Sequence, residues 1–118
     1  MSRHPDEIYI HHISEACQKI IHRLRGETWT SFEANEEKQD GIIRQMEIIG
    51  EASGKVSEAF RQHHPGITWR PMKDLRTILI HGHADVDLEE VWHIATRDVP
   101  QLHHQLRAFE QQWEEERE

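Results

Sequence analysis

The chain has 118 residues, which predicts one compact domain over residues 1–118. Its 22 acidic residues exceed its 14 basic ones and give a formal net charge of −8, which argues against non-specific nucleic-acid binding, since that binding depends on neutralising phosphates. Its single cysteine excludes an internal disulfide, and it has neither an apolar run long enough for a membrane span nor an apolar signal core, so we expect a cytoplasmic protein with no membrane contact.

Helical periodicity dominates the chain, and the alternation typical of strands is nearly absent. A first helix is expected to begin near Pro5 and to end near Gly26. Its apolar residues recur at steps of three and four: Tyr9, Ile13, Ala16, Cys17, Ile20 and Leu24. The cysteine among them is predicted to pack rather than to react. Residues 27–35 are expected to form a connection whose Trp29 and Phe32 pack against the bundle.

A second helical region is expected over residues 36–62. Its apolar stripe comprises Ile42, Ile43, Met46, Ile49, Ser53, Val56 and Phe60. Gly50 and Gly54 weaken this stripe, so a kink or a break into two helices is predicted between them. The sequence His63-His64-Pro65-Gly66 then predicts a helix end and a turn.

Two further helices complete the pattern. Trp69-Arg70-Pro71 is expected to open a short helix with Met72, Leu75, Ile78 and Leu79 inward, ended by Gly82. Asp87-Leu88-Glu89-Glu90 predicts the start of the last helix. The last helix carries the most regular stripe, which comprises Leu88, Val91, Trp92, Ala95, Val99, Leu102, Leu106, Phe109 and Trp113. Pro100 is expected to kink it. The fold class predicted is all-α, an antiparallel up-and-down bundle of four to five helices, with part of this stripe covered by a second copy in a homodimer.

The stretch from Arg76 to His83 combines a permanent cation with two imidazoles. Arg76 offers a planar fork that matches phosphate oxygens, and His81 changes charge near neutral pH. Arg70, Lys73 and Arg76 outnumber the nearby acid, which predicts a local basic pocket for a specific anionic ligand. The alternative interpretation makes Arg76 a solvated helix residue and His81 a histidine at the edge of the core.

Five residues turn a helix by about 140°, so Arg76 and His81 do not share one face of a regular helix. They can converge only around a helix end, where the dipole favours a protonated imidazole. Such a histidine could move a proton to or from a ribose oxygen, while Arg76 stabilises charge on the phosphorus. One histidine is too few for both proton transfers, so His83 or a second copy would supply another.

Other constellations are weaker. His81, His83, Asp85 and Asp87 could suggest a metal cluster, but alternate residues rarely converge, and neither a metal nor another cofactor is predicted. The doublets His11-His12, His63-His64 and His103-His104 are interpreted as solvated surface. Arg44, Glu47 and Glu51 are interpreted as ordinary neighbours on one helix.

The whole chain resembles the HepT-like branch of the HEPN proteins, ribonuclease toxins paired with a minimal nucleotidyltransferase antitoxin. Three blocks carry the resemblance in order and spacing: Arg44-Gln45-Met46-Glu47-Ile48-Ile49-Gly50-Glu51-Ala52, then Pro65-Gly66-Ile67-Thr68-Trp69, then Leu79-Ile80-His81-Gly82 with Val86-Asp87 and Val91-Trp92. The family's catalytic pattern is Arg, four to six residues, His, any residue, Tyr. Arg76 and His81 occupy its Arg and His positions.

The resemblance implies a dimeric helical bundle with metal-independent endoribonuclease activity, in which His81 is the general acid and base and Arg76 stabilises the phosphate. Arg70 and Lys73 would contact the RNA. Thr77 stands where the family often has Asn. His83 replaces the Tyr on which the partner enzyme can place AMP, which implies control by complex formation alone, modification of another residue, or lost toxicity.

The alternative hypothesis is a non-catalytic dimeric module that binds a nucleotidyltransferase and helps to present its nucleotide or substrate. The acidic charge and the replaced Tyr position favour this alternative. The retention of Arg76 together with His81 favours the enzyme, because a purely structural module needs neither.

Overall fold

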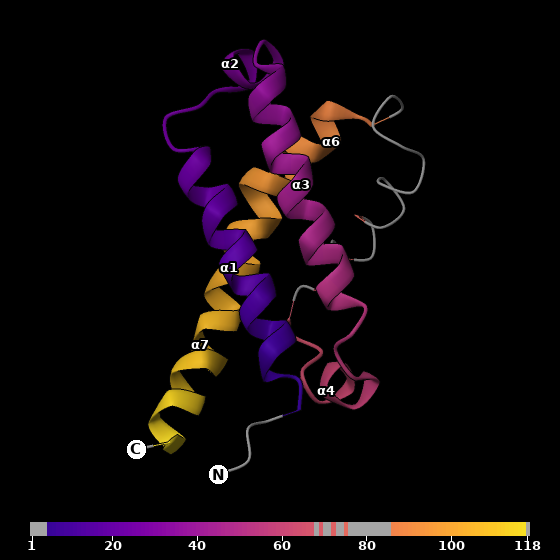
Figure 1. The fold of residues 1–118 in the computed structure, drawn as a ribbon, viewed down its shortest axis with the longest axis vertical. Helices are drawn as coiled ribbons and strands as arrows, with labels where there is room; N and C mark the ends of the chain where they lie inside the picture. Colours follow the sequence, from indigo (N-terminus) through magenta and orange to yellow (C-terminus); the bar gives the residue numbers. More distant parts are fainter. Residues whose placement is uncertain (1–4, 68, 70–71, 73–74, 76–85, 118) are drawn as a thin grey trace.

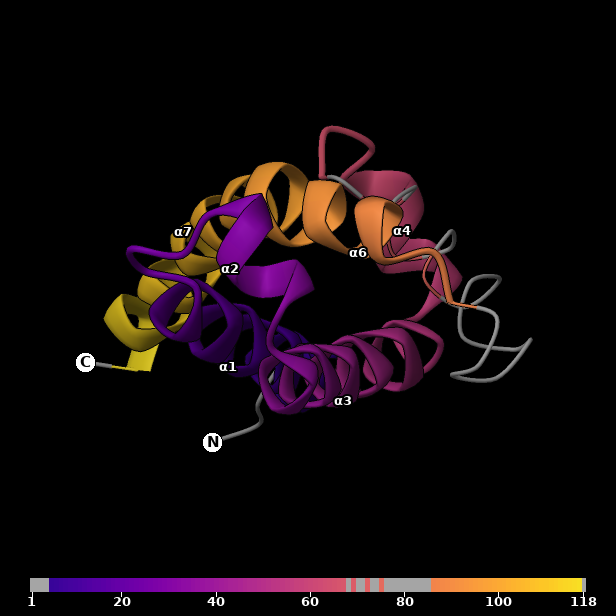
Figure 2. The same cartoon turned by 90° about the horizontal axis from the view of Figure 1, so that it is seen from above.

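The computed structural model describes residues 5–67, 69, 72, 75 and 86–117, and these residues form an all-α antiparallel bundle. Its long helices are α1 (Glu7–Arg23), α3 (Glu36–Ser53) and α7 (Val99–Arg117). Helix α1 lies between the other two and runs antiparallel to both (Figure 1). Seen from above, α1 and α3 form one layer, and α6 (Leu88–His93), α7 and α4 (Glu58–His63) lie across from it (Figure 2). The predicted fold class is therefore confirmed.

Helix α1 has the boundaries and the buried face that its periodicity predicts. It starts after Asp6, ends at Arg23 and is followed by Gly26, whose φ of 74° lies in the left-handed region that favours glycine. Its buried residues are Ile10, Ile13, Ser14, Ala16, Cys17 and Ile20. Tyr9, which the stripe also included, is only partly buried against the core.

The expected connection after α1 contains a helix of its own, α2 (Trp29–Glu33). The Ser31 N–H donates to the Thr28 side chain at 3.2 Å, and the Thr28 N–H donates to the Ser31 hydroxyl at 2.9 Å, which is a capping box. Phe32 is fully buried and its ring lies 5.2 Å from that of Trp92. Both predicted aromatic contacts are therefore confirmed, because Trp29 also packs against the core. The helix was missed because it is only 5 residues long.

The second helical region breaks into α3 and α4 after Ser53, close to where the glycines predicted it. Gly50 does not interrupt α3 and is buried within it, while Gly54 follows the last residue of the helix. The Asn35 side chain caps the start of α3, and the Ser57 hydroxyl accepts from the Phe60 N–H at 3.1 Å to cap α4. Helix α4 ends at His63, so the predicted turn at residues 63–66 is confirmed.

The last helical region differs from the expected kinked helix in a specific way. It comprises α6, the π-helical segment η2 (Ile94–Asp98) and then α7. The Asp87 side chain caps α6 by accepting from the N–H groups of Glu89 and Glu90. Pro100 has no N–H for the next α-helical bond, and the Val99 N–H just before it bonds to the Ile94 carbonyl, five residues back. A widened turn thus accommodates the proline.

The apolar stripe of the last region is covered within the chain itself. Its members Val91, Ala95, Val99, Leu102, Leu106 and Trp113 are buried, and Leu88, Trp92 and Phe109 pack partly buried against the core. Helix α1 lies along α7 in both views of the bundle (Figures 1 and 2). Most of the stripe is therefore buried within the chain, and the expectation that a second copy covers part of it stays a prediction.

Candidate functional site

Described residues on both sides of the predicted motif segment, residues 76–85, pack into the core. Before it, Trp69, Met72 and Leu75 are helical, and the side chains of Met72 and Leu75 are buried in the core. Trp69 donates its Nε1–H to the His64 carbonyl at 3.0 Å. After the segment, Val86 packs against the core. The short helix expected with Met72 and Leu75 inward is thus confirmed for those two positions.

The predicted site residues themselves fall outside the described residues. Arg76 immediately follows the buried Leu75 in sequence, and Asp87, which caps α6, comes two residues after the segment. The prediction that Arg76 and His81 converge around a helix end stays a prediction from sequence. The same holds for the remaining residues named for the motif and its helix, which are Arg70, Lys73, Thr77, Ile78, Leu79, Gly82, His83 and Asp85.

The block of the resemblance that begins at Arg44 lies in α3. Arg44, Glu47 and Glu51 all lie on α3, and the Arg44 guanidinium pairs with Glu47 at 3.5 Å, so the interpretation of these residues as helix neighbours is confirmed. Glu51 pairs with Lys55, just beyond the helix, at 3.8 Å. Sequence analysis missed Gln45, which is buried although it is polar. Its Oε1 atom has no hydrogen-bond partner among the described residues. A buried amide of this kind needs a polar partner, because an unsatisfied one costs free energy.

The sequence predicts that all three histidine doublets are solvated, but two of the doublets each contain a histidine that is partly covered. His11 and His12 are exposed, but the His64 ring lies 4.5 Å from each of the rings of Phe60 and Phe109. His103 is partly buried, and this burial, followed by the charge of Arg107, lowers the pKa of its imidazole below its ordinary value. The interpretation is wrong for these residues, since the turn after α4 and the α1–α7 contact each cover one member of a doublet.

A buried carboxylate links α7 to α1. Glu110 is 8 % exposed, and its Oε2 atom lies 3.0 Å from His11 Nδ1 on α1. Its other oxygen lies 3.6 Å from Arg107. Sequence analysis missed this group because Glu110 stands on the buried side of α7, between Leu106 and Trp113. Arg107 supplies an opposite charge and His11 a hydrogen-bond partner to a carboxylate that would be costly to bury alone.

Cys17 is fully buried, and burial raises the pKa of its thiol to about 12. A thiol held protonated is neither a nucleophile nor a metal ligand near neutral pH. The prediction that Cys17 packs rather than reacts agrees with this environment.

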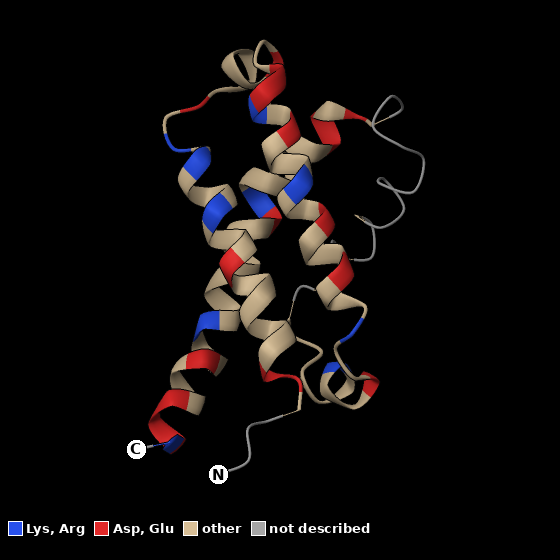
Figure 3. Ribbon diagram, viewed as in Figure 1, with Lys and Arg blue, Asp and Glu red and all other residues tan. Residues whose placement is uncertain are grey.

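Two hollows of opposite charge lie on the surface between α1 and α7. Figure 3 shows basic residues in the C-terminal half of α1 and acidic residues toward the C-terminal end of α7. The acidic hollow has a volume of about 530 Å³ and lies at the N-terminal end of α1. It is lined by Pro5, Glu7, Ile8, His11, Glu110, Trp113, Glu114 and Arg117. The basic hollow has a volume of about 480 Å³ and lies at the C-terminal end of α1. It is lined by Glu15, Gln18, Lys19, Ile21, His22, Arg23, Arg25 and His103. Sequence analysis missed it, although cations at helical spacing were a visible signal.

The described part of the chain offers neither a metal cluster nor a membrane span. There, no three His, Cys, Asp or Glu side chains gather closely enough to hold a metal ion. None of the helices in that part combines the length and the apolar character needed to cross a bilayer.

The family model described as "Ribonuclease HepT-like" matches residues 13–109. "Probable ribonuclease HepT" of Thermococcus cleftensis is 36% identical over 94 residues, which cover 80% of this chain and 86% of that protein. "Putative RNase MJ1380" of Methanocaldococcus jannaschii is 32% identical over 86% of this chain and 94% of its own length.

A longer protein of Methanocaldococcus jannaschii, "Gamma-glutamylcyclotransferase and putative RNase MJ0434", is 33% identical over 85% of this chain, which spans only 45% of that protein. No solved structure matches the chain. The matched block, residues 13–109, extends from within α1 into α7 and includes the predicted motif segment. The chain belongs to the HepT-like ribonuclease family of HEPN proteins.

Proposed function

We propose that this chain is the toxin of a toxin–antitoxin pair and cleaves RNA without a metal ion. The observation that carries the proposal is the match of a HepT-like ribonuclease model across residues 13–109, a frame that includes Arg76 and His81 at the spacing of the family's catalytic pattern. Relatives of similar length carry ribonuclease names, which supports RNA as the substrate class.

In this proposal, His81 takes the proton from a ribose 2′-hydroxyl or returns one to the leaving 5′-oxygen. The 2′-oxygen attacks phosphorus, the bond to the 5′-oxygen breaks, and Arg76 stabilises the negative charge that develops on the phosphate oxygens. Arg70 and Lys73 hold the RNA backbone, and Thr77 offers a hydrogen bond beside Arg76. Both proton transfers need a second group, which His83 or His81 of a second copy supplies in a homodimer.

The partner proposed is a minimal nucleotidyltransferase antitoxin. Because His83 stands at the position of the AMP-accepting tyrosine, we propose that the antitoxin acts by forming a complex rather than by modifying this position. An imidazole cannot carry AMP as the stable phenolic ester that tyrosine forms.

A second candidate is a non-catalytic dimeric module that binds the nucleotidyltransferase. The net charge of −8 favours this candidate, because a surface of that charge repels RNA outside a local basic site. Stable co-purification with the partner, with no toxicity and no RNA cleavage, would support the module over the enzyme.

The test in cells is expression of the chain alone, compared with the Arg76→Ala/His81→Ala variant and with Arg44→Ala as a control for loss of an exposed arginine on α3. We expect the unchanged chain and the control to arrest growth, the double variant to allow it, and co-expression of the proposed nucleotidyltransferase partner to restore growth. Equal growth of all three strains, together with intact RNA, would reject the enzyme.

A further inference from the structure

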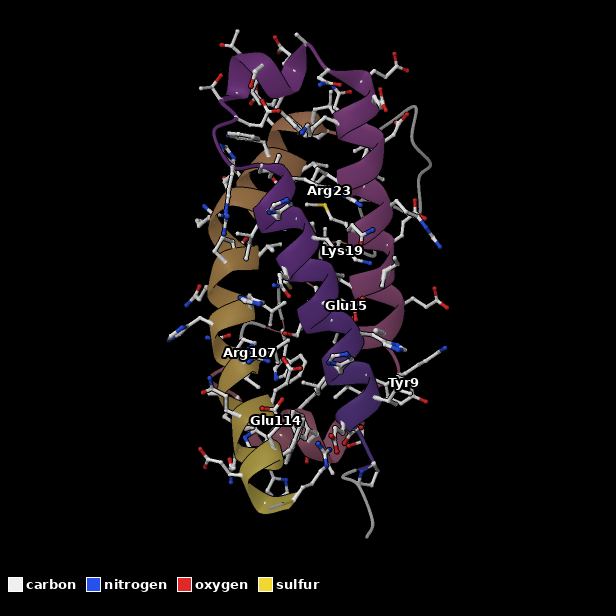
Figure 4. The ribbon with its side chains drawn as sticks, turned by 60° about the vertical axis from the view of Figure 1, so that its left-hand side comes forward. Tyr9, Glu15, Lys19, Arg23, Arg107 and Glu114 are labelled. Carbon is white, nitrogen blue, oxygen red and sulfur yellow. The ribbon has the colours of Figure 1, made fainter. Side chains whose placement is uncertain are left out.

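The basic hollow stands apart from the rest of this acidic chain. Lys19, Arg23 and Arg25 line it together with His22 and His103, and Glu15 is the only carboxylate in the lining. Glu15, Lys19 and Arg23 are spaced four residues apart and follow one another along α1, with α7 beside them (Figure 4). The hollow is therefore a concentrated positive site on a chain whose net charge is −8.

Both arginines of the hollow lack a carboxylate partner among the described residues. Elsewhere in that part of the chain, every Lys and Arg except Arg61, which donates to the Ser53 carbonyl, lies within 4 Å of an acid: Lys38–Glu27, Arg44–Glu47, Lys55–Glu51, Arg97–Asp98, Arg107–Glu110 and Arg117–Glu7. Arg23 instead donates to the Gly41 carbonyl at 3.4 Å, and Arg25 is exposed with no ion pair to a described acid. These guanidinium groups keep uncompensated charge.

Lys19 is only partly neutralised. It lies 3.6 Å from Glu15, which His11 also contacts at 3.4 Å, so one carboxylate is shared by two cations when His11 is protonated. The carbonyl of Arg23, near the negative end of the α1 dipole, accepts a hydrogen bond from the Lys38 ammonium at 3.0 Å. Lys38 therefore satisfies one of the free carbonyls at the end of α1. The cationic side chains of the hollow are not needed for this and remain available to bind an anion.

We propose that the basic hollow binds a phosphate group of an RNA backbone, outside the predicted motif segment. Arginine presents a planar fork to phosphate oxygens, and a volume of about 480 Å³ accommodates a phosphate with its sugar. This inference rests on the proposed function for its choice of RNA as the phosphate source. The imidazole of His103, whose burial favours the neutral form, lies in the same lining and becomes easier to protonate beside a bound phosphate.

The test uses the full chain and a fluorescein-labelled 20-nucleotide RNA whose 2′-hydroxyls are methylated, so that binding is measured without cleavage. The hollow variant is Lys19→Gln/Arg25→Gln. Its matched control is Arg44→Gln/Lys55→Gln, which removes the same charge from two exposed positions, one on α3 and one in the turn that follows it. Circular dichroism melts establish that both variants fold. Arg23 is left unchanged because it links α1 to α3.

We expect the hollow variant to lose affinity about tenfold at low salt and to bind with a salt slope smaller by about 1, as for the loss of one to two contacts with single-stranded phosphates. The control should change affinity less than threefold. Unchanged affinity in the hollow variant, an equal loss in the control, or no RNA binding by the unchanged chain would each overturn the proposal.

Inorganic phosphate separates an RNA site from a site for small anions. In the unchanged chain, RNA should raise the pKa of His103, followed by NMR, at far lower concentration than inorganic phosphate does. The assignment to RNA would also be overturned if inorganic phosphate raised the pKa of His103 while the hollow variant bound RNA as tightly as the unchanged chain.

Cleavage of unmodified RNA by the unchanged chain tests the proposed function separately. Binding through the hollow without cleavage would leave this inference standing and reject the ribonuclease. Cleavage by the unchanged chain, together with RNA binding by the hollow variant that equals that of the unchanged chain, would support the ribonuclease and reject this inference.

Discussion

The Asp6 carboxylate binds Ser57 with both of its oxygens: the Ser57 N–H donates to Oδ1 at 2.8 Å and the Ser57 hydroxyl donates to Oδ2 at 2.8 Å. Asp6 precedes α1 and is 4 % exposed, while Ser57 caps α4. One carboxylate thus joins the start of α1 to the helix that leads toward the motif segment.

Asp6→Ala should lower the free energy of unfolding by about 2–3 kcal/mol, because two hydrogen bonds to a charged acceptor disappear and the Ser57 N–H loses its partner. Urea denaturation followed by circular dichroism measures the change. Asp40→Ala, an exposed position of α3, is the control and should stay within about 0.5 kcal/mol. In a double-mutant cycle with Ser57→Ala, the two losses should be less than additive. Fully additive losses would contradict the contact.

Gly26→Ala should destabilise the protein by about 1 kcal/mol, because its φ of 74° strains any residue with a Cβ. A Cβ at this position meets no other atom within 4 Å, so the cost is conformational alone. Gly66→Ala is the matched control, since a Cβ there also meets nothing and its φ is not positive. Thermal melts measure the stability of both variants. An equal loss of stability in Gly26→Ala and Gly66→Ala would reject the positive φ as the cause.

The lowered pKa of His103 predicts a pH dependence of stability. Below its ordinary pKa of about 6.5, the unfolded chain binds this proton more readily than the folded chain does, so the contribution is present at higher pH and is lost as the pH falls below 6.5. Urea denaturation between pH 7.5 and pH 5 should show a smaller loss of stability in His103→Gln than in the unchanged chain. His12→Gln, which removes an exposed histidine of α1, should follow the unchanged chain. Identical profiles for all three would contradict the direction of the shift.

His83→Tyr should make the chain an acceptor for AMP from a catalytically active nucleotidyltransferase partner, while ribonuclease activity is retained or falls before modification. The reason is chemical, since a phenol oxygen forms the stable ester that an imidazole does not. Intact-mass spectrometry detects the added AMP, and His83→Phe, which has the ring without the hydroxyl, is the control. A tyrosine variant that takes up AMP and keeps full activity would contradict the control role assigned to this position.

The sequence predicted the fold because the long apolar stripes are regular. The stripe of α1 and that of α7 each recur at helical steps, and the burial of Ile13 and Leu106 follows directly. Two features that do not depend on the spacing of apolar residues were not predicted. Helix α2 depends on a capping box, and the π-helical turn depends on how Pro100 is accommodated. Both arise from local hydrogen bonding rather than from hydrophobic pattern.

Charges and histidines were harder to place than apolar residues, because their burial depends on partners from other elements. Glu110 is buried where His11 hydrogen-bonds to it and Arg107 pairs with it, and His64 is covered because Phe109 reaches it from α7. The basic hollow likewise needs His103 on α7 to lie beside α1. By contrast, Arg76 and His81 were identified from spacing and family resemblance, and their mutual geometry remains a prediction.

The central claim is tested most directly by incubating the purified chain with a defined RNA in excess EDTA and resolving the products. We predict cleavage that leaves 2′,3′-cyclic phosphate ends, slowed about 100-fold or more by Arg76→Ala or by His81→Ala and unaffected by Arg44→Ala. Intact RNA with the unchanged chain, or cleavage by both variants at the unchanged rate, would contradict the account.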